Sequence, residues 1–418
     1  MWLFDRDLWI EVFNTLGKNM FRTFLTMLGV IFAMMILMLL LGSANGMSNG
    51  FDKLFAGTAS NSLFVWSQST SEPYKGFERG RRINFRIEDA SILKEQIPEI
   101  EVLAPRIELG SHRDVVTVYR KGRTSGSTVY GDYPEIDNIT KKKLVEGRFL
   151  NKTDIEDSKK VCVIGEETYK LLFDKGEEAI GEDIRINGVF FRIVGIYKPN
   201  NNINIDGENA VFIPFSTFQK AFSSGDRMGW MAIAVEEGTK VPVVEQEIKK
   251  VLKAKYDISP TDERAIGSFD MSEVFNNITT FTDVLKWFSG FVGGCSLFAG
   301  VIAISNILLI TVKERTKEIG VRRALGATPL IVRRQIILEA VVLTTFAGLV
   351  GFAISVGILA GLDALFGQGD DFPFKNPMVS ISQFIGYFLV MIFFSLLIGL
   401  IPAHKAIKVR PIEALREE

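Results

Sequence analysis

The run TFLTMLGVIFAMMILMLLLG, residues 23–42, contains no Asp, Glu, Lys or Arg. As an α-helix it rises about 30 Å, which is the thickness of the hydrocarbon core of a bilayer. Three further apolar runs lie in the last third of the chain, at residues 287–312, 335–362 and 381–402. We therefore predict an α-helical membrane protein with four transmembrane helices in a 1+3 arrangement and a large domain between the first and the second helix.

A cleaved signal peptide is the alternative interpretation of the first run. The run ends in LGSANGMSNG, residues 41–50, which has no convincing small-x-small cleavage site, so we interpret it as a retained anchor. In residues 1–22, apolar side chains recur at helical spacing from Leu8 to Leu16. This pattern predicts a cytoplasmic amphipathic helix in the membrane interface. A helical extension of the first span is the other reading of the same residues.

The distribution of Lys and Arg predicts the orientation in the membrane. Residues 313–334 contain seven Lys or Arg and two Glu, whereas the short loop at 363–380 is mainly acidic. The tail at 403–418 carries Lys and Arg again. Short basic loops stay in the cytoplasm. Both termini and residues 313–334 are therefore predicted to be cytoplasmic, and residues 43–286 extracytoplasmic.

The sequence argues against several classes of function. A net charge of -1 without a basic stripe argues against nucleic-acid binding. No HExxH, GxSxG or metal-spaced cluster occurs, so we predict no catalytic site, no metal and no bound cofactor, and we interpret acidic residues such as Glu177 as solvated. No GxxxxGK[ST] loop occurs either, so any ATP chemistry must come from another chain. Cys162 and Cys295 lie in different regions, which excludes a structural disulfide between them.

The extracytoplasmic domain has the pattern of a mixed α/β fold. The dipeptide Asn187-Gly188 stands between two alternating apolar runs and predicts a type I′ hairpin. Residues 161–172 and 209–222 each predict a strand followed directly by a helix, the second one capped by Ser216. Further strands are expected at residues 62–67, 100–109 and 230–237, and helices at 87–96 and 241–256.

Polar, glycine-bearing stretches at residues 110–113 and 223–229 are the expected boundaries within this domain. A middle piece, about residues 111–224, would then be inserted into an outer piece. That outer piece would consist of about residues 43–110 and 225–275.

The segment VKERTKEIGVRRALGATPLIVRRQIILEA, residues 312–340, predicts a helical bend that protrudes from the bilayer. Glu318 and Arg322 have the i,i+4 spacing of an ion pair, and Gly326 suits a helix C-terminus. Thr328 then caps a new helix with Pro329 in its first turn. An exposed, stiff bend fits a cleft on a soluble partner. The alternative is a basic loop that only sets the topology.

Within this segment, ERTKEIGVRRALGAT (residues 314–328) resembles the signature after the second span of FtsX-like permeases, the membrane subunits of the MacB class of ABC transporters. NMFRTFLTMLGVIFA resembles the first span of that family. VCVIGEETYKLLF and AIGEDIRINGVFFRIVGIY resemble the middle of its outer domain, and RPIEALREE resembles its C-terminal end. The resemblance implies a bacterial inner-membrane protein whose outer piece is porter-like and whose inserted piece is sabre-like.

The resemblance also implies a partner. This sequence lacks the fused nucleotide-binding domain of MacB, so a separate ABC ATP-binding subunit would hold ATP and Mg²⁺. Two permeases, as a homodimer or with a similar permease, would work with two ATPases. The implied ATPase-coupling residues are Arg315, Glu318, Ile319, Gly320, Arg322, Arg323 and Gly326. The tail residues implied to lie near the same partner are Pro411, Ala414, Leu415 and Arg416.

Two features of the spans concern packing. Glu339 is the one obvious charge within a predicted span, and we expect it to pair with Arg334 or with the bend. Small-xxx-small spacing, which marks close helix packing within one subunit or between two, occurs at Gly290, Gly294, Gly357 and Gly361.

Three functions remain open at this point. The first is mechanotransmission: ATP hydrolysis inside drives a shape change outside that exports a drug, a peptide or another substrate from the periplasm, with an adaptor and an outer-membrane channel as further partners. The second is a lipoprotein-releasing complex of the same architecture. The third is an FtsX-like regulator of a cell-wall hydrolase or a sensor kinase. The large outer domain with its inserted piece favours the first.

Overall fold

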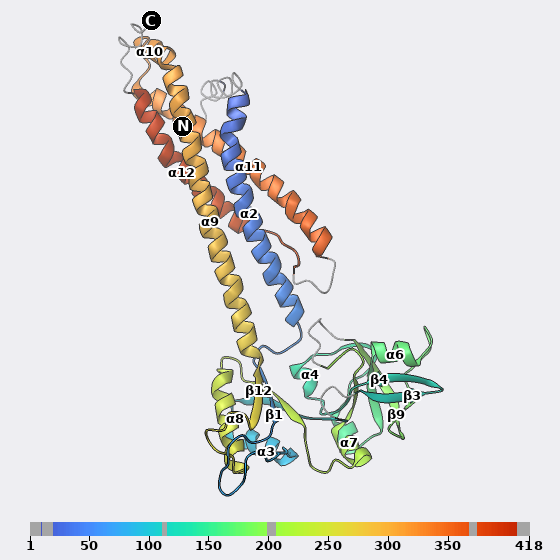
Figure 1. Cartoon of the computed structure of the whole chain (residues 1–418). Coiled ribbons are helices and arrows are strands. Elements are labelled where there is room, and N and C mark those ends of the chain that lie inside the picture. The colour runs from blue at the N-terminus through green and yellow to red at the C-terminus, as the bar shows by residue number, and fades with distance from the viewer. Residues whose placement is uncertain (1–9, 11–19, 111–114, 199–205, 368–373, 408–418) are drawn as a thin grey trace. The chain divides into compact units, whose positions relative to one another are not determined.

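The computed structural model describes residues 10, 20–110, 115–198, 206–367 and 374–407 (Figure 1). The chain divides into two compact units. One is Lys53–Ile278, and the other combines Met1–Asp52 with Thr279–Glu418. The predicted amphipathic helix at residues 1–22 lies almost entirely outside the described residues.

Within the described residues, four helices are long and apolar enough to cross a membrane, which confirms the predicted 1+3 arrangement. They are α2 (Met20–Phe55), α9 (Met271–Glu314), α11 (Pro329–Phe366) and α12 (Ile381–Ile407). Each extends beyond its apolar run, and α9 begins 16 residues before the predicted start at 287. The predicted ranges mark only the apolar part of each helix, because the backbone hydrogen bonds of a helix continue past the residues that suit lipid.

Glycines bring these helices close together. A Cβ at Gly293 of α9 would lie 2.1 Å from Leu37 of α2, and a Cβ at Gly351 of α11 would lie 2.6 Å from the Ile31 carbonyl oxygen. Only glycine fits such contacts. Between α11 and α12, the hydroxyl groups of Thr344 and Ser395 lie 2.7 Å apart. The four helices thus form one bundle with its own apolar core.

The described part of the other unit is built on one 12-stranded sheet. Its strand order is β12-β1-β11-β2-β5-β10-β7-β9-β8-β3-β4, and β6 pairs with β9. The strands are β1 (Ser62–Ser67), β2 (Ile100–Glu108), β3 (Val116–Arg120), β4 (Arg123–Ser127), β5 (Val129–Asp132), β6 (Lys143–Gly147), β7 (Val161–Gly165), β8 (Asp183–Ile186), β9 (Val189–Lys198), β10 (Val211–Pro214), β11 (Trp230–Val235) and β12 (Ile266–Asp270). The helices are α3 (Ile87–Gln96), α4 (Ile136–Ile139), α5 (Lys152–Glu156), α6 (Glu166–Leu172), α7 (Phe215–Phe222) and α8 (Val241–Lys255). The unit is thus a mixed α/β domain, as predicted.

Local predictions in this unit hold with one exception. The β8–β9 hairpin turns at Asn187 and Gly188, which have φ of 46° and 87°, as a type I′ turn requires. Both strand-then-helix units form, as β7–α6 and β10–α7. Ser216 is not a cap, however, because α7 begins at Phe215 and the Ser216 hydroxyl donates to the Ile155 carbonyl oxygen of α5.

The sheet continues across the predicted boundary between the outer and the inserted piece. Strand β2 pairs with β11 on one side and with β5 on the other. Residues on both sides of the boundary therefore share one hydrogen-bonded sheet. The division into porter-like and sabre-like parts stays a prediction.

Candidate functional site

The bend between α9 and α11 is the candidate functional site. Helix α9 ends at Glu314, Arg315 leaves the helical conformation, and the short helix α10 (Thr316–Ala324) follows. Gly326 has φ of +105°, a conformation that glycine adopts without strain, and it ends α10 as predicted. Thr328 is the N-cap position of α11 and Pro329 opens that helix, but the Thr328 side chain makes no capping hydrogen bond. The predicted cap was right in position and wrong in mechanism.

A chain of ion pairs connects α10 to α11. The Arg322 guanidinium lies 2.7 Å from one carboxylate oxygen of Glu318, and the Arg315 guanidinium lies 3.3 Å from the other. Arg315 also lies 3.5 Å from Glu339 Oε1 on α11. Glu339 is buried, and its pairing with the bend confirms the expectation from sequence. The α9–α10 break is therefore tied to a membrane-spanning helix by charge.

The inner side of the bend is apolar and packed. Ile319 of α10 packs on an apolar cluster, and the neighbouring Gly320 is buried. The Arg323 guanidinium donates to the Ile407 carbonyl oxygen, 2.9 Å away, at the end of α12. The cluster under α10 consists of Val312, Val332, Ile336, Ala403 and Ala406. Of the predicted coupling residues, Ile319 and Gly320 are thus directed into the bundle.

The outer side of the bend carries apolar residues that the sequence reasoning missed. Leu325 is 83% exposed, and Val321, Leu330 and Ile331 are exposed as well. A signal was present in the sequence, because these apolar residues interrupt a strongly charged segment. Exposed apolar residues beside charges are typical of a protein-binding surface.

The other predicted site residues fall into two groups. The tail residues Pro411, Ala414, Leu415 and Arg416 lie outside the described residues. Among the small-xxx-small glycines, a Cβ at Gly290 would lie 2.6 Å from the Tyr387 hydroxyl, so this position packs on α12. At the other three, which are Gly294, Gly357 and Gly361, a Cβ would have no described atom within 4 Å outside its own stretch of helix.

A second charged site, in the α/β unit, is fully buried. Arg106 of β2 is 1% exposed, and its Nε and NH2 groups lie 2.6 and 2.8 Å from the two carboxylate oxygens of Asp132. Asp206 pairs with both Arg106 and Lys142. Burial by itself would raise the pKa of Asp206, but these two cations outweigh it and hold the pKa below its usual value. The rings of Tyr130, Phe212 and Trp230 surround the guanidinium.

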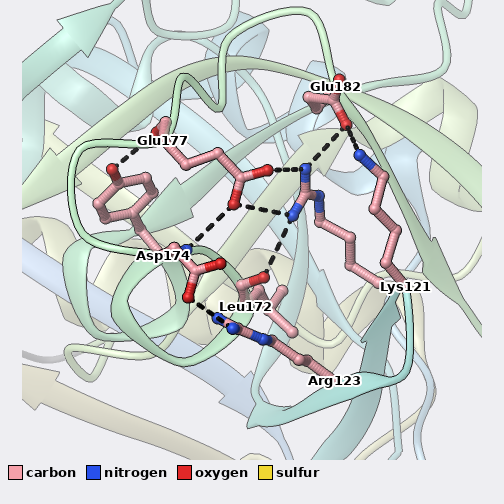
Figure 2. Close-up of polar contacts among 8 residues, drawn as sticks. Lys121, Arg123, Leu172, Asp174, Glu177 and Glu182 are labelled. Atoms are coloured by element: carbon pink, nitrogen blue, oxygen red, sulfur yellow. Dashed lines mark hydrogen bonds and ion pairs between the residues drawn. The ribbon is translucent and has the colours of Figure 1, made fainter.

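A third charged cluster fixes the β3–β4 hairpin (Figure 2). Arg120 lies 2.7 Å from Glu177 and 2.9 Å from Glu182, and Arg123 lies 2.6 Å from Asp174. The hydrogen bond from Arg120 is the main cause that lowers the pKa of Glu177 to about 2. Glu177 is therefore an ion-pair partner, and its interpretation as a merely solvated residue was wrong.

In both the Arg106 site and the Arg120 cluster the carboxylates are paired with cations, an arrangement that stabilises the fold. Among the residues that the structure describes, no group of three or more His, Cys, Asp or Glu side chains is placed to hold a metal ion. The bend, with its exposed apolar side, is therefore the better candidate for a functional contact.

Two family models match this chain. A family model described as a MacB-like periplasmic core domain matches residues 23–251, and one described as an FtsX-like permease C-terminal region matches residues 290–411.

Curated relatives align along nearly the whole chain. The macrolide export ATP-binding/permease protein MacB of Bdellovibrio bacteriovorus is 27% identical over 97% of this chain, which spans 61% of that protein's length. Two uncharacterised ABC transporter permeases of Bacillus subtilis are similar over almost their full length. YvrN is 26% identical over 97% of this chain and 98% of its own, and YknZ is 27% identical over 95% of both. The crystal structure of the periplasmic region of MacB from Actinobacillus actinomycetemcomitans is 19% identical, covers 54% of this chain and 95% of its own, and has a TM-score of 0.43.

Proposed function

Since this chain belongs to the family of FtsX-like ABC transporter permeases with a MacB-like periplasmic core domain, we propose that it is the transmembrane subunit of a MacB-type transporter. A separate cytoplasmic ABC ATPase binds the bend and hydrolyses ATP. The resulting movement changes the shape of the extracytoplasmic domain and drives export of a substrate from the periplasm. Two copies of the chain work with two ATPases, and both termini lie in the cytoplasm.

The continuity of α9 carries this proposal. The helix is uninterrupted for 44 residues, from Met271 directly after β12 to Glu314, and Arg315 alone separates it from α10. A displacement of α10 is passed along this continuous helix towards strand β12. The ion pair of Arg315 with Glu339 and the bond of Arg323 to Ile407 pass it to α11 and α12 as well.

Export is supported by the names of relatives. MacB of Bdellovibrio bacteriovorus is a macrolide export protein, and PvdT of Pseudomonas syringae, 27% identical over 96% of this chain, is a pyoverdine export protein. Capture of partners by the tagged full chain in its native membrane tests export against the two alternative functions. A periplasmic adaptor or an outer-membrane channel supports export. A bound lipoprotein, or a cell-wall hydrolase or sensor kinase, would replace export by one of the two alternative functions.

The contact with the ATPase is tested on the bend. The ATPase is the ABC ATP-binding protein that co-purifies with the tagged full chain. We expect Leu325→Asp to reduce its recovery at least tenfold, because a charge replaces the most exposed apolar residue of the bend. Val243→Asp is the matched control, since Val243 is an exposed apolar residue of α8 in the other unit. Full recovery with both Leu325→Asp and a scrambled 318–323 segment would contradict the proposal, as would ATP hydrolysis by the purified chain alone in lipid discs.

A further inference from the structure

A groove runs along α8 in the α/β unit and has a volume of about 640 Å³. One face of α8 packs on the core of that unit. The groove follows another face of the helix, from Pro242 to Ala254, and its remaining lining residues come from two loops, at 74–75 and 257–263. Pockets that hold small ligands have volumes of this size. We call this feature the α8 groove.

The two loops that line the α8 groove are held in place by the fold. Lys75 and Gly76 have φ of 46° and 84°, as the central residues of a type I′ turn require. The Lys75 ammonium group lies 2.7 Å from the Asp257 carboxylate of the other loop. The Arg81 guanidinium donates to the Asp257 carbonyl oxygen, 3.0 Å away. The walls of the groove are therefore formed before a ligand enters.

Lysines outnumber carboxylates in the α8 groove. Its lining contains four Lys and three Asp or Glu side chains, so it carries a net charge of +1. Lys249 lies 2.6 Å from Glu245, whereas the exposed Lys250 has no carboxylate partner among the residues that the structure describes. The Lys250 ammonium group is therefore available to an anionic ligand.

Lys253 is a buried cation with an incomplete set of partners. Its side chain is 10% exposed, and its ammonium group lies 3.5 Å from Glu263, whose side chain is 77% exposed. An ammonium group has three N–H donors. Within the described part of the chain it makes one hydrogen bond, to the Pro260 carbonyl oxygen 2.9 Å away. Since a buried charge is costly unless it is paired and hydrogen-bonded, Lys253 favours a ligand that brings a carboxylate into the groove.

The other groups of the groove narrow the class of ligand. Its three carboxylates repel a polyanion, but they can accept hydrogen bonds from N–H groups. Pro242, Ala254 and Pro260 add exposed apolar surface. The helix face from Pro242 to Ala254 is about 18 Å long, which is the span of about five residues of extended chain. A peptide supplies backbone N–H groups and apolar side chains, and an acidic peptide also supplies carboxylates for Lys250 and Lys253.

We propose that the α8 groove binds a short, extended, acidic peptide, whose carboxylates pair with Lys250 and Lys253. This inference goes beyond the proposed function, because the groove lies within the α/β unit and binding there requires neither the ATPase nor the bend. Capture of the ATPase and binding of the peptide can therefore fail independently of each other.

Fluorescence anisotropy with the purified full chain, in discs of a zwitterionic lipid, tests the proposal. The probes are two pentapeptides with blocked termini and the same uncharged dye, one of alternating Asp and Leu and one of alternating Lys and Leu. We expect the acidic peptide to bind at least tenfold more tightly than the basic one, because like charges repel in the groove. Equal affinities would overturn the proposal.

Variants of the lysines locate the binding site. We expect Lys250→Glu to weaken binding of the acidic peptide at least tenfold, because it reverses the charge of an exposed side chain in the groove. Lys253→Gln should have an effect of similar size. The matched control is Lys220→Glu, an exposed position on α7, which should change the affinity less than about twofold. If Lys253→Gln does not fold, Lys250→Glu decides alone, and unchanged affinity in that variant would overturn the proposal.

A variant of Glu263 should change the affinity in the opposite direction. Glu263→Gln removes the carboxylate that competes with the peptide for Lys253, so binding should become about threefold tighter. Weaker binding in this variant would contradict the assigned role of Lys253. Displacement of the peptide by inorganic phosphate at constant ionic strength would overturn the peptide as the ligand, in favour of a simple anion.

Discussion

The bend and the Arg106 site use charge in opposite ways. In the bend, four charged residues form a series of ion pairs across the break between α9 and α10. Two of them, Arg322 and Glu318, are partly exposed to solvent. The Arg106 site encloses its cation between two carboxylates and three rings, at the junction of β2, β5, β10 and β11. Partly exposed ion pairs are weak and can exchange partners. A buried, fully paired network is rigid, since removal of one partner leaves an uncompensated charge. We therefore expect the ion pairs of the bend to give way more easily than those of the Arg106 site.

The largest effect is expected at the buried site. Arg106→Leu leaves Asp132 and Asp206 without their common cation, and it should reduce the free energy of unfolding by about 3–5 kcal/mol. Tryptophan fluorescence during thermal unfolding of the full chain measures this, because Trp230 lies against Arg106. The control is Arg192→Leu, which removes a pair that is about half exposed, and it should cost at most about 1 kcal/mol. An equal decrease in the free energy of unfolding in Arg106→Leu and Arg192→Leu would contradict the difference proposed between buried and exposed ion pairs.

A smaller effect is expected at the link between the bend and α11. Glu339→Gln removes the negative charge that pairs with Arg315, so backbone hydrogen exchange within residues 316–324 should accelerate by about tenfold, as loss of a largely buried ion pair predicts. The exposed side is unchanged, so the ATPase should still co-purify while its hydrolysis responds less to the permease. Lys317→Gln, on the exposed side of α10, is the control. Unchanged exchange in Glu339→Gln would show that the ion pair does not hold the bend.

The turn after α10 offers a test of backbone conformation alone. Gly326→Ala places its methyl group within 4 Å of no atom of the described residues, so its cost is expected to come from the positive φ and to be about 1 kcal/mol. Limited proteolysis within residues 324–328 should become correspondingly faster. Gly357→Ala also meets no atom but lies inside α11, where alanine favours the helix. Slower proteolysis of residues 324–328 in Gly326→Ala than in the unaltered chain would contradict the positive φ of Gly326.

The smallest effect concerns acid stability of the β3–β4 hairpin. The pKa of Glu177 is lowered from 4.5 to about 2 by its hydrogen bond with Arg120, so this contact stabilises the fold above about pH 4.5 and is lost as the pH falls towards 2. Glu177→Gln should therefore show a smaller drop in Tm between pH 5 and pH 3 than the unaltered chain. Asp183→Asn, which changes the exposed pair with Arg192, is the control. If Tm fell equally in the unaltered chain, Glu177→Gln and Asp183→Asn, the acid sensitivity would not come from the Glu177–Arg120 pair.

Local features of the fold were predictable because their causes are local. The Asn187-Gly188 turn follows from the positive φ that these residues tolerate, and the end of α10 follows from Gly326 for the same reason. The Glu318–Arg322 pair follows from helical spacing alone. The outer side of the bend escaped prediction, because whether Leu325 is covered or exposed depends on how α10 lies on α11 and α12.

The sequence by itself determined four membrane-crossing helices, the strand-and-helix order of the α/β unit and the bend between the second and third spans. Each of these depends on composition, periodicity or glycine conformation within a short stretch. Only the tertiary structure decided that Arg106 meets Asp132 and Asp206, and which side of α9 packs on α2. A membrane helix is apolar on every side, so its sequence does not distinguish a face that meets lipid from one that meets protein. The partners of a buried charge come from distant strands, and only the completed sheet brings them within bonding distance.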